Sequence, residues 1–157
     1  MALVASIGMP LAVLTAIYTA YLFAQARARD LWQSALLPAH LAVQAVLAGA
    51  AALAPVALVV ERHAVATLLA VIAAASAMHV LLVVGEMTLP HATAHARLAA
   101  SEITEGAYQA YFRAGLALSA VGMFAPWIGV AAFGPALAGL LIYEHAYVQG
   151  AQRVPIA

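Results

Sequence analysis

Long apolar stretches separated by short polar segments make up most of this chain. A transmembrane helix needs about 20 mainly apolar residues, and the polar breaks leave five stretches near that length. These stretches predict helices over residues 3–25, 34–60, 65–87, 108–125 and 133–149. We therefore predict an all-α, polytopic transmembrane bundle that forms a single domain over residues 1–157.

The polar connections suggest where several helices begin and end. Ser34 is a candidate cap for the second helix, with Pro38 tolerated in its first turns. Thr88 and Pro90 form a helix-start signal after the third stretch, which predicts a short interfacial helix. Residues 107–149 are too long for one crossing, and "PWIG" and "FGP" in their middle predict a turn between two helices.

The composition supports a membrane protein and narrows its chemistry. Of the 157 residues, 67% are hydrophobic and 8% are charged, whereas soluble domains carry about 25% charged residues. The formal net charge is zero, so nothing favours nucleic-acid binding. The chain has no cysteine, which excludes disulfides and thiolate-held clusters within it and leaves any iron–sulfur centre to a partner subunit.

Arginine placement predicts the orientation, because loops rich in Lys and Arg normally stay in the cytoplasm. With five crossings, one side holds Arg27, Arg29, Arg97, Arg113 and Arg153, and the other side holds Arg62. We therefore expect a cytoplasmic C-terminus. The first helix would then translocate its N-terminus without flanking charge, so we expect the sequence to be the rear part of a longer protein.

Three polar residues interrupt the third apolar stretch, in "SAMHVLLVVGE". Ser76, His79 and Glu86 share one helix face and extend over roughly 15 Å, from near the midplane to the cytoplasmic end. Ionisable groups in hydrocarbon are costly and are often functional. One interpretation is a proton relay or the wall of a wet cavity. The other is that His79 makes a single hydrogen bond to a neighbouring helix while Glu86 is solvated among the headgroups.

Other polar residues lie near the predicted cytoplasmic boundary. His40 and Gln44 are one turn apart, and Tyr147 fits an interfacial tyrosine belt. Glu144 should pair with an arginine such as Arg113 or Arg153.

Six histidines leave haem and metal ligation to be considered. A membrane cytochrome needs paired axial histidines at matching depths. His79 has no match, because His40 and His145 are predicted nearer the surface, so we expect no haem. His91, His95 and Glu102 share a helical face, but a solvated helix face is favoured over a metal site.

Several short motifs follow the order of a known family. They are Tyr18-Thr19-Ala20, the basic Arg27 and Arg29, Leu31-Trp32, Leu37-Pro38, Ala48-Gly49 and the tail from Gly150 to Pro155. In these features the chain resembles the NrfD/PsrC family, the membrane subunits of polysulfide reductase-like molybdoenzyme complexes.

The resemblance implies a quinone-interacting anchor in the prokaryotic inner membrane. Such an anchor carries no haem and docks an iron–sulfur subunit, which connects to a molybdopterin catalytic subunit, so electrons pass between the menaquinone or ubiquinone pool and the clusters. The family's quinone pocket lies largely in a front four-helix bundle, of which this chain would supply one helix, and another membrane subunit would supply the rest. Tyr18 and His40 are the candidates for a pocket contribution. The alternative is a structural assembly subunit without a quinone or proton role.

Overall fold

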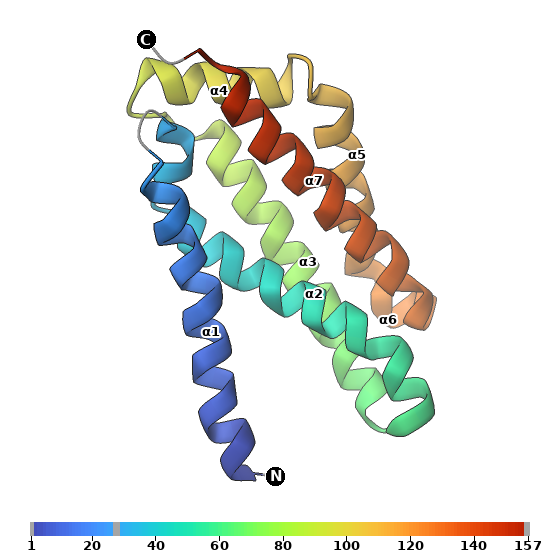
Figure 1. Ribbon diagram of the computed structural model, residues 1–157. Coiled ribbons are helices and arrows are strands. Elements are labelled where there is room, and N and C mark those ends of the chain that lie inside the picture. The colour runs from blue at the N-terminus through green and yellow to red at the C-terminus, as the bar shows by residue number, and fades with distance from the viewer. Residues whose placement is uncertain (1, 27–28, 156–157) are drawn as a thin grey trace.

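Helices account for nearly all of the computed structural model, which describes residues 2–26 and 29–155, with only the backbone for 2–5 (Figure 1). The α-helices are α1 (Ala2–Ala24), α2 (Leu37–Val60), α3 (Ala64–Thr88), α4 (Ala94–Thr104), α5 (Gln109–Val121), α6 (Ala125–Ile128) and α7 (Phe133–Arg153). Short 3-10 turns are η1 (Asp30–Gln33), η2 (Gly122–Phe124) and η3 (Gly129–Ala132). The predicted all-α helical bundle is confirmed.

Four helical stretches of the described residues are long and apolar enough to cross a membrane. The fourth, Gln109–Arg153, has 45 residues and doubles back on itself, so that α7 returns alongside α5 (Figure 1). The reversal includes Gly129, whose φ of 71° lies in the left-handed region that favours glycine. The Gly/Pro segment therefore makes the turn that its sequence predicts.

The helices contribute unequally to the core. α3 packs between α2 and the α5–α6 segment, and α7 covers α2, α4 and α5. α1 contacts α2 and η1, but its N-terminal half diverges from the bundle (Figure 1). Ala20 is the one fully buried side chain among those described in α1. The polar residues of the interior are therefore enclosed mainly by α2, α3, α5 and α7.

Two helix starts differ from the prediction. The hydroxyl of Ser34 accepts from the backbone N–H of Leu36 at 3.2 Å, two residues on, so Ser34 shapes the turn ahead of α2, which begins only at Leu37. Thr88 is the last residue of α3, and its hydroxyl donates to the carbonyl of Val84 at 2.6 Å. The cap of α4 is Thr93 instead, whose side chain accepts from the N–H of Ala96.

The connections at one end of the bundle are tied together. α4 lies across this end, beside η1 and the C-terminal part of α7 (Figure 1). Arg29 Nη1 donates to the carbonyls of Ala151 at 3.2 Å and Val154 at 2.8 Å, which satisfies acceptors that the end of α7 leaves free. The neighbouring Arg27 lies outside the described residues. The α2–α3 turn, which holds Arg62, is at the opposite end of α3.

Glycines allow α5 and α7 to approach closely. A Cβ on Gly115 would lie 2.6 Å from the backbone nitrogen of Tyr143, and a Cβ on Gly139 would lie 2.5 Å from that of Ser119. Small residues play this role at many membrane helix contacts. The position of Tyr143 against the interior therefore depends on these two glycines.

Gly139→Ala should destabilise the hairpin, because the added methyl group meets backbone that has little room to move. Overpacking of this kind typically costs about 1–3 kcal/mol. Gly49→Ala is the matched control, since a Cβ there meets no atom within 4 Å, and alanine favours a helix by about 1 kcal/mol over glycine. Thermal unfolding of the purified protein in detergent measures both. Equal melting temperatures for the two variants would contradict the close contact.

Candidate functional site

A line of hydrogen-bonded side chains is buried where α2, α3 and α7 meet. His40 Nδ1 lies 3.2 Å from Glu86 Oε2, and His40 Nε2 lies 2.9 Å from His79 Nδ1. Each of the three residues is at most 3% exposed. His40 of α2 therefore joins two residues of α3 that the sequence places on one face but two turns apart.

The antiparallel pairing of α2 and α3 explains why His40 fits between them. The helices are joined by the short connection at residues 61–63, so residues equally far from this turn lie at similar depth. Counting back from it places His40 about level with Val84, between His79 and Glu86. The expectation that His79 has no matching histidine was wrong, because the side chains of His40 and His79 meet at 2.9 Å, and this register was the signal that could have corrected it.

Tyr147 of α7 completes the surroundings of the carboxyl group. Its hydroxyl lies 2.9 Å from Glu86 Oε1 and 3.3 Å from the backbone carbonyl oxygen of Leu31. A hydroxyl carries one proton and can also accept, so Tyr147 donates to Glu86 when that carboxyl is ionised. When Glu86 is protonated it can donate to Tyr147, which then donates to Leu31. Both forms of the carboxyl group thus find a hydrogen-bond partner.

The two histidines can adjust to either form because a neutral imidazole has one donor and one acceptor nitrogen. With Glu86 ionised, His40 donates to it from Nδ1–H, and His40 Nε2 accepts from His79 Nδ1–H. In the reverse arrangement Glu86 donates to His40, and His40 donates to His79. This reversal of donors and acceptors is the chemistry by which a line of hydrogen bonds passes a proton.

Tyr143 covers the histidine pair from α7. Its ring centroid lies 5.4 Å from that of His40 and 5.0 Å from that of His79, nearly perpendicular to the latter at 88°. Its side chain is fully buried, and within the described structure its hydroxyl has no hydrogen-bond partner. Tyr143 therefore acts mainly through ring packing, in contrast to Tyr147 one turn on.

Ser76, the third residue of the predicted stripe, does not join the line. It is fully buried, and its hydroxyl has no hydrogen-bond partner among the residues described. It faces Gly122 so closely that a Cβ there would collide with it. His79 Nε2 is likewise without a partner in the described part of the chain. The line of hydrogen bonds thus ends at His79, one turn from Ser76.

A second, partly buried pair lies one turn further along α2 and one turn back along α7. Gln44 Nε2 donates to Glu144 Oε1 at 2.6 Å. The expected arginine partner of Glu144 was wrong, since Arg153 instead lies 3.6 Å from Glu102 at the surface. An amide satisfies this carboxyl group without placing a second charge in the bundle.

The distance between the His40 and His79 nitrogens is relevant to whether the two residues bind a metal ion. An ion bound by two imidazoles separates their nitrogens by up to about 4 Å, whereas His40 and His79 bond directly at 2.9 Å. Within residues 2–26 and 29–155, no group of three or more histidine or carboxylate side chains has the spacing of a metal site. His91, His95 and Glu102 therefore do not form one in this structure.

The two candidates for quinone contact occupy different surroundings. Tyr18 is 59% exposed and lines a shallow, largely apolar groove along α1. The rest of that lining is Leu11, Leu14, Thr15, Ile17 and Tyr21. His40 is not among these residues, and the protein occupies both of its ring nitrogens.

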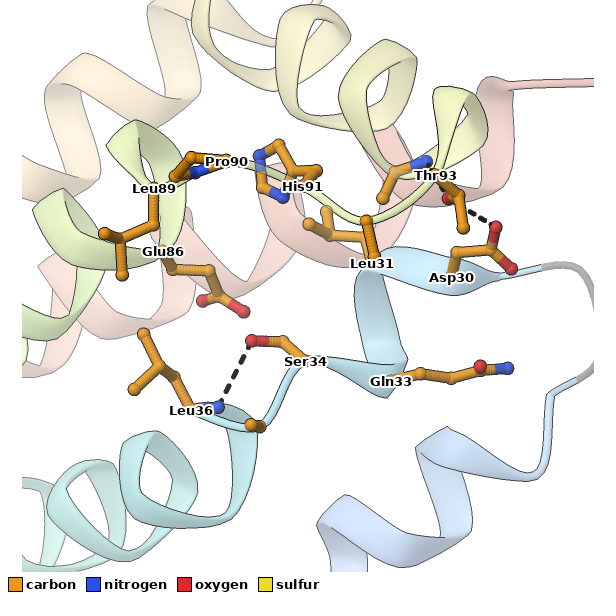
Figure 2. A pocket seen from close by; sticks show the side chains of 13 residues that line it. Asp30, Leu31, Gln33, Ser34, Leu36, Glu86, Leu89, Pro90, His91 and Thr93 are labelled. Atoms are coloured by element: carbon orange, nitrogen blue, oxygen red, sulfur yellow. Dashed lines mark hydrogen bonds between the residues drawn. The ribbon is translucent and has the colours of Figure 1, made fainter.

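A pocket lined by both polar and apolar residues lies on the outer side of Glu86, between the α1–α2 and α3–α4 connections (Figure 2). Its volume is about 410 Å³. Glu86 is shared between this pocket and the buried line, with its carboxylate directed toward Ser34 in Figure 2.

The sequence has a match among known protein families. The family model described as polysulphide reductase, NrfD matches residues 1–145. The chain belongs to the NrfD family. No curated protein and no solved structure matches it. NrfD proteins are membrane subunits of quinone-linked oxidoreductase complexes that work with iron–sulfur and molybdopterin subunits, and this chain is accordingly a multi-pass membrane protein.

Tyr147→Phe in this NrfD chain should weaken the site, because Glu86 loses the one hydroxyl donor that it has from α7. A hydrogen bond contributes about 0.5–1.5 kcal/mol between neutral groups and about 1.5–3 kcal/mol to a charged group, so the stability of the purified protein should fall by about 1–3 kcal/mol. Tyr143→Phe is the control, since its hydroxyl bonds to nothing described. Infrared spectroscopy should show a shifted Glu86 carboxyl band in the first variant alone. Similar losses of stability in Tyr147→Phe and Tyr143→Phe would show that altered packing, and not the lost hydrogen bond, is the cause.

Proposed function

We propose that this chain is the quinone-linked membrane subunit that handles protons while electrons pass between the quinone pool and the iron–sulfur clusters of a partner. The observation that supports this most strongly is the buried line Glu86–His40–His79. A structural subunit needs hydrogen bonds to fix its helices, but it does not need an ionisable group at three successive positions.

Quinone chemistry supplies the reason for such a line. Oxidation of a quinol releases two electrons and two protons, and reduction of a quinone takes up the same numbers. The electrons would go to or come from clusters held by other subunits, because this chain lacks the cysteine ligands. The protons need groups that change protonation state inside the bundle, and Glu86, His40 and His79 are such groups.

The free-energy cost of placing these ionisable residues in a membrane is the second observation that supports the proposal. An ionisable side chain within a membrane helix is expensive, by at least about 2.5 kcal/mol on insertion scales. A leucine or methionine would fill the same space at lower cost. The proposed cytoplasmic C-terminus places Glu86 near the cytoplasmic end of α3 and His79 two turns deeper, so the line would lead from that surface toward the membrane interior.

Replacing relay residues tests the proposal in the assembled complex. His79→Ala and Glu86→Gln should each lower quinone-linked turnover by a factor of about 100 or more, the range typical of positioned proton-transfer groups. Activity with an artificial dye that donates electrons directly to the partner subunits should be unchanged, and co-purification of those subunits with each variant shows that the complex still assembles.

The control for this experiment is His145→Ala, because His145 lies on α7 but is exposed and packs beside Tyr108 and Tyr111. It should retain full activity by both assays. If all three variants keep quinone-linked turnover, the chain acts as a structural assembly subunit instead.

For quinone contact we propose the groove along α1 that contains Tyr18. Its apolar residues suit an isoprenoid tail and a ring, and the exposed hydroxyl of Tyr18 is a hydrogen-bond donor for a quinone carbonyl. Helices of another membrane subunit, or of a longer form of this chain, would close the groove from the side that faces away from α2.

Tyr18→Phe should raise the KM for quinol about fivefold with little change in kcat, which corresponds to the loss of one hydrogen bond worth ~1 kcal/mol. Tyr111→Phe is the matched control, because Tyr111 is similarly exposed on a different helix. An unchanged KM in Tyr18→Phe would place quinone contact elsewhere.

A further inference from the structure

We infer that the pocket beside Glu86 is the aqueous mouth of the proton line, at which Glu86 exchanges protons with the compartment that α4 faces. This inference rests on the proposed function and adds the route by which protons reach the relay. It follows from the position of the pocket, from its lining and from the way its walls are joined.

The lining of the pocket suits water. About half of the residues that line it carry polar side chains, namely Asp30, Gln33, Ser34, Glu86, His91 and Thr93, and the others, such as Leu36 and Leu89, are apolar. Its volume of about 410 Å³ has room for several water molecules, each of which takes about 30 Å³ in the liquid. In the inferred mouth, water molecules would gather at the polar side of this lining, beside the carboxyl group of Glu86.

Glu86 is the link between the pocket and the interior. It lines the pocket, yet it is only 3% exposed, because His40 and Tyr147 bind its two oxygens from behind. His40 and His79 do not line the pocket. A proton that enters from the water must pass through the carboxyl group of Glu86 to reach them.

The two walls of the pocket are fastened to each other. Thr93 Oγ1 donates to Asp30 Oδ2 at 2.6 Å, which joins the turn η1 to the start of α4 across the rim (Figure 2). The same Thr93 oxygen accepts from the N–H of Ala96 at 3.1 Å. This hydrogen bond holds the two walls together at the rim, and the Asp30 carboxylate gives the rim a negative charge that attracts cations.

Because the sequence has no cysteine, an introduced cysteine is its one thiol, and the complex without the substitution, treated in the same way, corrects for thiols of the partner subunits. Ala92 lines the pocket, so Ala92→Cys in the complex, reconstituted in vesicles, should react with a membrane-impermeant methanethiosulfonate from the side that holds the C-terminus. The modification places a charged plug in the pocket. Quinone-linked proton uptake should then lose most of its rate, while dye-linked activity of the partner subunits is unchanged.

Two single-cysteine variants serve as controls for the side from which the reagent reacts and for the effect of modification outside the pocket. Leu98→Cys, which is exposed on α4 outside the pocket lining, should react from the same side without slowing proton uptake. His63→Cys, in the α2–α3 turn, should react only from the opposite side.

The outcomes separate this inference from the proposed function. If Glu86→Gln stops proton uptake but modified Ala92→Cys does not slow it, or if Ala92→Cys resists the reagent, the relay stands and the mouth lies elsewhere. If neither Glu86→Gln nor the modification affects proton uptake, the relay itself is wrong and the mouth falls with it.

Discussion

The carboxyl group of Glu86 needs partners because it lies within a bundle whose outer surface is adapted to lipid. Leaving such a group without hydrogen bonds would cost several kcal/mol. Two groups meet this requirement, a ring nitrogen from α2 and a hydroxyl from α7, and a backbone carbonyl from η1 in turn lies within reach of that hydroxyl. The relative placement of these elements is therefore linked to one side chain of α3.

The close contact between α5 and α7 serves the same arrangement from a distance. Gly115 and Gly139 let α7 sit deep against α5, and one helical face then presents Tyr143 to the histidine rings and Tyr147 to the carboxyl group. Packing by small residues and polar pairing thus depend on each other. Small residues alone would leave α7 free to rotate, and the polar groups alone could not bring its backbone near enough.

The positions of the helices could be predicted from the sequence, but the contacts between the helices could not. Hydropathy located the long helices, and the Gly/Pro segment located the reversal near Gly129, because both depend on local composition. His40 was assigned to the boundary because its depth was judged within its own helix, whereas its partners follow from the register of α2 against α3. Tyr147 matched an interfacial tyrosine for the same reason. Which way a tyrosine near a helix end points depends on the rotation of α7, which no local pattern encodes.

One acceptor in the site belongs to the main chain. Besides Glu86, the Tyr147 hydroxyl has the backbone carbonyl oxygen of Leu31 within reach. Every amino acid supplies a carbonyl oxygen at this position. Genetic variation at position 31 can therefore alter the hydrophobic packing of the side chain without deleting the acceptor. What this part of the network requires is the path of the backbone through residues 30–33. The length and geometry of the connection therefore matter more for it than the identity of each amino acid.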